Sequence, residues 1–161
     1  MYPLLIQRGA LVNQKDMYGD TVLHVATMAD SPVNTLALLV SNGAVINERN
    51  KEGVTPLSLA IETNHPAQVK YYAQNGADIY AEDMEGNSPL SKALDMETTD
   101  MLETLVNASN ITSKDSSGNT ALHIAISKDA PIEHIKYLVD AGADVNARNK
   151  NGDSVLFITV Q

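Results

Sequence analysis

The sequence predicts an all-α solenoid of stacked helix–turn–helix pairs joined by short β-hairpin loops. Five glycines recur at intervals of 34, 33, 32 and 34 residues, and these are Gly19, Gly53, Gly86, Gly118 and Gly152. One constant period along a whole chain is typical of stacked repeats. In addition, the 161 residues include one Phe, six Tyr and no Trp. So few aromatic side chains indicate a core made of thin layers of Leu, Ile, Val and Ala.

The first helix of each copy is expected just after these glycines. A hydroxyl residue follows each glycine, and the five are Thr21, Thr55, Ser88, Thr120 and Ser154. Such a side chain caps a helix by accepting hydrogen bonds from its free backbone N–H groups. Pro56 and Pro89 come next in two copies, and proline suits the first helical position because that position needs no N–H donor.

A second helix is expected after a break that contains proline. The breaks hold Pro32, Pro66 and Pro131. Proline restricts the residue before it and favours the start of a new helix. Apolar residues then recur at helical spacing, as Leu36, Leu39 and Val40 do. The second helices are expected to end at glycines with a left-handed C-cap conformation, which are Gly43, Gly76 and Gly142.

The loop after each second helix is expected to form a hairpin. An Asp or Asn that can bond its own backbone stands at each tip, and these are Asp16, Asn50, Asp83, Asp115 and Asn149. In the third copy the glycine is missing, and the sequence Asn107-Ala108-Ser109-Asn110 replaces it. Because Ala disfavours positive φ, the left-handed position falls to Asn107 or Asn110, or a different turn forms. We therefore expect a kink or soft spot between the third and fourth copies.

Two motifs recur with the period. The first is written Thr21-Val22-Leu23-His24, Thr55-Pro56-Leu57-Ser58, Ser88-Pro89-Leu90-Ser91, Thr120-Ala121-Leu122-His123 and Ser154-Val155-Leu156-Phe157. The second, Gly-Ala-Asp-Val-Asn, is complete at 142–146 and partial in earlier copies. On these motifs the chain resembles the ankyrin repeat family over essentially its whole length. The resemblance implies one domain, with repeats at 16–49, 50–82, 83–114 and 115–148 and partial repeats at 1–15 and 149–161.

The partial copies at both ends lack a covering neighbour. Residues 2–9 read as a second helix without its first, and residues 154–161 read as a first helix without its second. Each exposed large apolar side chain forgoes about 1.5–3 kcal/mol. We expect either that the chain is a piece of a longer array or that two copies associate end to end.

Composition argues against several classes of function. A net charge of −9 disfavours nucleic acid as a partner, because phosphate binding needs clustered Lys and Arg. Without Cys, thiolate metal sites and cysteine catalysis are excluded. His24 and His123 are expected to link neighbouring turns, as the resemblance implies, rather than to act in chemistry. We therefore expect no enzyme activity, cofactor, metal or membrane insertion, and the start of the chain does not resemble a signal peptide, which favours a cytoplasmic location.

The resemblance places the binding residues on hairpin tips and on the exposed ends of the first helices. We call this surface the concave strip. In the first three copies its candidate residues are Met17, Tyr18, Asp20, Met28, Lys51, Glu52, Val54, Glu62, Met84, Glu85, Asn87, Asp95 and Met96. The fourth copy offers small polar residues there. Because Met and Tyr suit adaptable binding surfaces, we expect the partner across copies one to three.

Charge is concentrated in the same part of the chain. Between Asp78 and Glu103 there are eight carboxylates and one lysine, a net charge of −7. This favours a partner protein with a basic surface, although solubility alone explains the same charge. The function we expect is noncatalytic protein binding. The alternatives are a structural spacer or a regulatory segment of a longer multidomain protein.

Overall fold

The computed structural model describes residues 11–158. The interpretation of residues 2–9 as a helix lies outside this range. The described helices are α2 (Val22–Met28), α3 (Val33–Ser41), α4 (Pro56–Glu62), α5 (Pro66–Gln74), α6 (Pro89–Leu94), α7 (Asp100–Ala108), α8 (Ala121–Ser127), α9 (Ile132–Asp140) and α10 (Val155–Ile158). Between residues 11 and 158 there is no strand, and one isolated antiparallel bridge joins Arg148 to Ser154.

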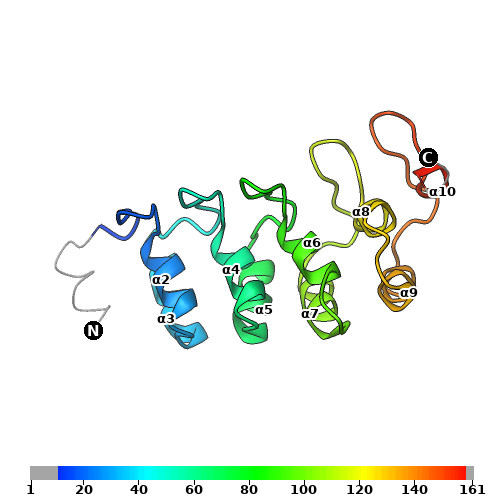
Figure 1. The fold of residues 1–161 in the computed structure, drawn as a ribbon. Coiled ribbons are helices and arrows are strands. Elements are labelled where there is room, and N and C mark those ends of the chain that lie inside the picture. The colour runs from blue at the N-terminus through cyan, green and yellow to red at the C-terminus, as the bar shows by residue number, and fades with distance from the viewer. Residues whose placement is uncertain (1–10, 159–161) are drawn as a thin grey trace.

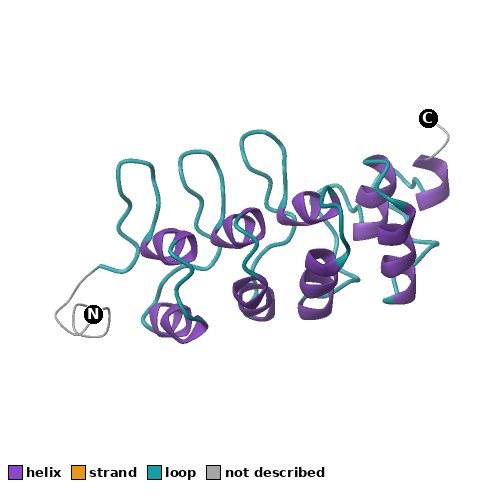
Figure 2. Cartoon of the chain, turned by 60° about the horizontal axis from the view of Figure 1, so that its bottom comes forward, coloured by secondary structure: helices purple, strands orange, loops and turns teal. Residues whose placement is uncertain are grey.

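The helices form two rows. The first helices α2, α4 and α6 lie side by side, the second helices α3, α5 and α7 lie beneath them, and the hairpin loops project beyond the first row (Figures 1 and 2). This arrangement confirms the predicted all-α solenoid.

The helix starts follow from the capping residues. The hydroxyls of Thr55 and Ser88 accept hydrogen bonds from Ser58 N and Ser91 N, each at 3.2 Å. Pro56 and Pro89 occupy the first positions of α4 and α6. These helices are short, at seven and six residues, so their stability comes from packing rather than from their own backbone hydrogen bonds.

The breaks between paired helices differ slightly from the sequence expectation. Pro66 begins α5, but Pro32 and Pro131 cap α3 and α9 from the position before the helix. The loops before α3 and α9 hold one residue more than the loop before α5, so their proline falls outside the helix. All three loops contain a non-glycine residue with positive φ, and these are Asp30 at 47°, Asn64 at 57° and Asp129 at 53°.

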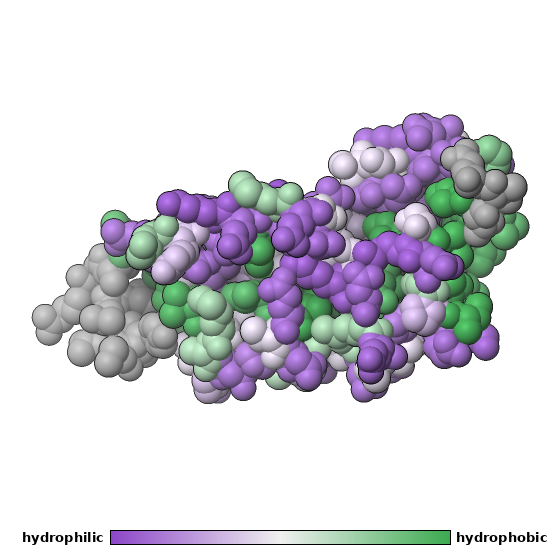
Figure 3. Space-filling view, viewed as in Figure 1, coloured by the Kyte–Doolittle hydropathy of each residue, from purple (hydrophilic) through white to green (hydrophobic). Residues whose placement is uncertain are grey.

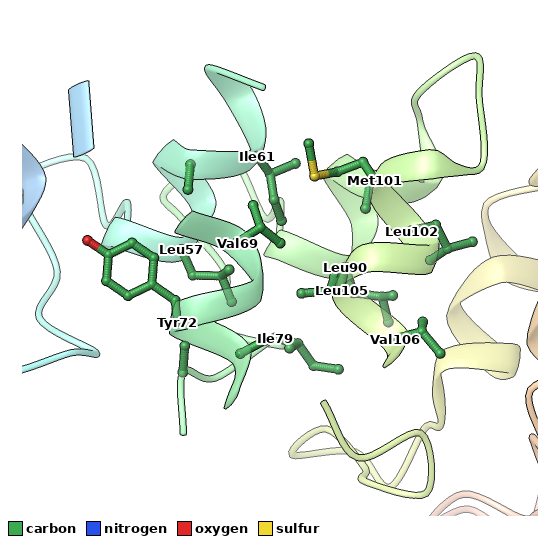
Figure 4. Close-up of a cluster of buried hydrophobic side chains, with 14 of the residues drawn as sticks. Leu57, Ile61, Val69, Tyr72, Ile79, Leu90, Met101, Leu102, Leu105 and Val106 are labelled. Carbon is green, nitrogen blue, oxygen red and sulfur yellow. The ribbon is translucent and has the colours of Figure 1, made fainter. Parts of the chain in front are cut away.

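The core consists of apolar layers between the two rows, as Figure 4 shows for its middle. Leu57, Leu90 and Leu105 are completely buried, and so is Tyr72. The Tyr72 hydroxyl lies 2.7 Å from Thr27 Oγ1 on α2. Because the Thr27 hydroxyl already donates to Leu23 O, Tyr72 is the donor in this pair.

The stack turns between the third and fourth copies. The axes of α8 and α9 run in a different direction from those of α2 to α7 (Figures 1 and 2). Neither Asn107 nor Asn110 adopts positive φ. Instead, Ser109 is extended, with φ −108° and ψ 179°, and α7 ends there. The predicted kink is present, and its cause is an extended turn in place of the left-handed C-cap.

The kink also separates two hairpins. At the other junctions, neighbouring hairpins are joined by backbone hydrogen bonds, from Lys51 N to Tyr18 O at 3.0 Å and from Met84 N to Glu52 O at 2.9 Å. Lys150 N donates to Ser117 O in the same way. Within the described part of the chain, no such bond joins the third hairpin to the fourth. The first three hairpins therefore form one continuous edge, and the fourth hairpin stands apart.

Candidate functional site

The hairpin tips present most of the predicted residues to solvent. Met17 is 74% exposed, Tyr18 63% and Met84 81%. Lys51, Glu52 and Glu85 are also exposed, whereas Asp20 and Asn87 are half-buried. In the view of Figure 3, the edge that carries the hairpins is mostly hydrophilic, with a few hydrophobic residues between. Met17, Tyr18 and Met84 lie at the loop tips and are not part of the hydrophobic core.

The predicted residues on and near the first helices are less uniform. Met28, Glu62 and Asp95 are exposed. Met96 is half-buried and packs against the core. Val54 is only 8% exposed, and its backbone carbonyl accepts a hydrogen bond from His24 Nε2 at 3.0 Å. Met96 and Val54 therefore support the strip more than they project from it.

Two hollows bring many of these residues together. The first lies between the first two hairpins and is lined by Met17, Tyr18, Asp20, Asn50, Lys51 and Glu52. The second lies between the second and third hairpins and is lined by Glu52, Val54, Glu62, Asp83, Met84, Glu85, Asn87 and Lys92. Glu52 borders both hollows, so they are adjacent. Met28, Asp95 and Met96 line neither.

Lys92 is a residue of this surface that sequence reasoning did not select. Its Nζ pairs with Glu62 on α4 and lies 2.7 Å from Asp83 Oδ2 on the third hairpin. Although burial opposes both charges, these hydrogen bonds hold the pKa of Asp83 below its usual value and raise the pKa of Lys92. Lys92 thus joins two copies of the repeat and neutralises part of the second hollow.

A signal for Lys92 was present in the sequence. The same repeat position holds Val25, Leu59 and Ile124 in the other copies. A lysine among apolar equivalents is a departure that a comparison of the copies reveals. Comparison of the copies also identifies Val25, which is exposed on α2 beside the predicted Met28.

The histidines of the first motif hold structure together, as expected. His24 Nδ1 accepts a hydrogen bond from Thr21 N at 3.1 Å, so Nε2 carries the proton that is donated to Val54 O. His123 makes the corresponding contact with Asp153 O at 3.2 Å. Burial lowers the pKa of His24, which favours the neutral tautomer that this geometry needs.

Two further structural findings concern the described residues. Between residues 11 and 158, no group of three or more His, Asp or Glu side chains is placed to hold a metal ion. Over the same range, every helix is too short to cross a membrane.

Comparison with known families decides what kind of array this is. Residues 2–83 and 68–149 match the family model described as ankyrin repeats in three copies. The chain belongs to the ankyrin repeat family. Ankyrin repeats generally serve in protein–protein interaction.

A solved structure supports the same assignment. The crystal structure of the ankyrin repeat domain of Bcl-3, described as a unique member of the IkappaB protein family, is similar with a TM-score of 0.72 and 31% sequence identity. The match covers 96% of this chain and 70% of that one. No curated protein sequence shows significant similarity. The ankyrin array is thus established, and its partner has to be inferred from its own surface.

Proposed function

We propose that this ankyrin array binds a partner protein without catalysis, on the concave strip of its first three copies. The observation that carries the proposal is the exposure of Met17, Tyr18 and Met84 on hairpins that form one continuous edge. Large apolar side chains on rigid loop tips add contact area to a complex without ordering new backbone. The kink marks the C-terminal limit of this edge.

The partner surface that suits the strip is basic. Glu52, Glu62 and Glu85 are exposed and border the second hollow. Opposite charges accelerate association and disfavour partners of like charge. The same argument disfavours nucleic acid as the ligand of this strip.

Affinity capture from the native cell with the intact chain tests this function. The double variant Tyr18→Ala with Met84→Asp is compared with the wild type. We expect the variant to lose most of the captured protein, because both changes remove apolar contact area. A control variant, Ile132→Ala with Lys136→Ala, changes exposed residues of α9 and should capture the partner normally. Capture that the strip variant leaves intact would contradict this placement of the site and favour the spacer or regulatory alternatives.

End-to-end association is a separate proposal. Leu156 and Phe157 are 76% and 52% exposed on α10, the last helix of the described range. Sedimentation over a range of protein concentrations tests it. We expect a concentration-dependent increase in mass if two copies cover these ends, and a constant monomer mass would contradict the proposal.

A further inference from the structure

The chemistry of the concave strip changes along the array. At its start, four exposed apolar side chains come from the first hairpin and from α2, and we call them the apolar patch: Met17, Tyr18, Val25 and Met28. Val25 is 42% exposed and Met28 48%. In the second copy the residue that corresponds to Met28 is Glu62, and in the third copy it is Asp95. At this position the strip is therefore apolar in the first copy and acidic in the two that follow.

The second hollow is the acidic half. Four carboxylates border it, from Glu52, Glu62, Asp83 and Glu85, against the single ammonium group of Lys92. Its remaining lining includes the exposed apolar side chain of Met84 and the small exposed part of Val54. A carboxylate rim with an apolar wall is complementary to a Lys or Arg side chain, whose aliphatic stem packs on apolar atoms while its charged end meets the acids.

We propose that the strip binds a partner segment with an apolar block and an adjacent basic block. The apolar block covers the apolar patch, and the basic block extends over the second hollow. This inference rests on the proposed function and adds the chemistry of the ligand. Neither half suffices to define the ligand: apolar area alone lacks selectivity, and exposed charge alone contributes little affinity.

Lys92 sets the strength of the acidic half. It already occupies two of the four carboxylates, Glu62 and Asp83. A basic side chain of the partner must share them with Lys92. Replacement of Lys92 by leucine, the residue of the second copy at this position, leaves those carboxylates to the partner. The Lys92→Leu variant should therefore bind a basic segment more tightly than the wild type.

Synthetic peptides test the proposal directly. One pair of peptides carries a Leu–Phe block joined to an Arg–Lys block, in both orders along the chain. A second pair replaces the apolar block by Ser, and a third replaces the basic block by Glu. Fluorescence anisotropy with the intact chain should show binding of at least one apolar–basic order. The Ser and Glu peptides should bind about tenfold or more weakly.

Variants of the protein then test which part of the strip binds the apolar block of the peptide and which part binds the basic block. Val25→Ser with Met28→Ser should weaken the apolar–basic peptide about tenfold and leave the Ser peptide unchanged. Glu62→Gln with Glu85→Gln should weaken both peptides, and Lys92→Leu should strengthen both about threefold. The control is Ile132→Ser with Glu133→Gln on α9, which makes the same types of change outside the strip. Circular dichroism melting checks folding, and Met17→Ser with Tyr18→Ser replaces the α2 variant if that variant unfolds.

The outcomes separate this inference from the proposed function. Equal binding of all peptides, tighter binding of the Glu peptide, or weaker binding after Lys92→Leu overturns the inference. If the Tyr18→Ala with Met84→Asp variant still loses the natural partner in that case, the proposed function stands and only the ligand chemistry is wrong. If partner capture does not depend on the strip either, both proposals fail.

Discussion

The Tyr80 hydroxyl donates a hydrogen bond to the Ser113 backbone carbonyl at 2.9 Å. This bond takes the place of the hydrogen bonds that an asparagine makes between neighbouring loops in the earlier copies. In the earlier copies the equivalent residue is Asn. Asn47, for example, donates to Gly76 O at 3.1 Å and accepts from Asp78 N at 2.9 Å. Tyr80 has a longer reach and makes one such bond to the next loop. It spans the junction at which the stack turns.

Loss of the Tyr80 hydroxyl should weaken this junction. We expect Tyr80→Phe to lower the free energy of unfolding by about 0.5–1.5 kcal/mol, because a partly buried hydrogen bond is removed and the ring stays. Urea unfolding measures the change. Tyr18→Phe, which removes a hydroxyl from an exposed ring, should change stability by much less. Equal effects of the two substitutions would show that the bond to Ser113 has no net role.

Two glycines at the same hairpin position test the separation of the third and fourth hairpins. Gly19 and Gly86 have φ of 81° and 83°, so alanine is strained similarly at both. A Cβ at Gly19 would lie 2.8 Å from Lys51 N, whereas at Gly86 nothing lies within 4 Å. We expect Gly86→Ala to cost about 1–2 kcal/mol from φ alone, and Gly19→Ala to cost about 1–3 kcal/mol more. Thermal or urea unfolding that gives equal costs would mean that the third and fourth hairpins are in contact.

The buried hydroxyl of Tyr72 should make the folded protein less stable at alkaline pH. Burial raises the pKa of Tyr72 to about 12, while the unfolded chain has the ordinary value of 10.0. Between these values the unfolded state has lost the proton and the folded state retains it, so stability falls as pH rises. The fall from this residue is about 3 kcal/mol in total, because each unit of pKa difference corresponds to about 1.4 kcal/mol. Tyr72→Phe should have a flatter profile between pH 10 and 12, and a profile with the wild-type slope would contradict this origin.

The buried imidazole of His24 should make the folded protein less stable as the pH falls into the acid range. Burial lowers its pKa below the ordinary 6.5, so the unfolded state takes up a proton first as pH falls. The stability that it contributes is present above pH 6.5 and is lost below it. His24→Ser introduces the side chain that the next two copies hold at this position, and it should cost about 1 kcal/mol at neutral pH through loss of the bond to Val54 O. The difference from the wild type should shrink as pH falls, and a difference independent of pH would contradict a neutral, buried His24.

The local features of the repeat were predictable because short motifs determine them. Thr55 and Pro56 specify a helix start through one side chain and one missing donor, both visible in the sequence. The positive φ of Asp30 could also have been found, since Asp and Asn tolerate the left-handed region better than most residues.

Contacts between copies were harder to predict. Lys92 pairs with Glu62, which is 30 residues away, and that pairing depends on how α4 and α6 lie beside each other. The half-buried position of Met96 likewise depends on the α6–α7 loop rather than on its place in the repeat. Sequence reasoning could therefore propose the strip and select the exposed residues Met17, Tyr18 and Met84, but it could not predict the ion pairs that set the charge of the second hollow.

The central claim is that a partner protein binds the strip of the first three copies. Amide hydrogen exchange of the chain, alone and with the captured partner, measures this most directly. We predict slower exchange in the first three hairpins and at the C-terminal ends of α2, α4 and α6, with α5, α7 and α9 unchanged. Protection confined to the second helices, or to residues beyond the kink, would contradict the account.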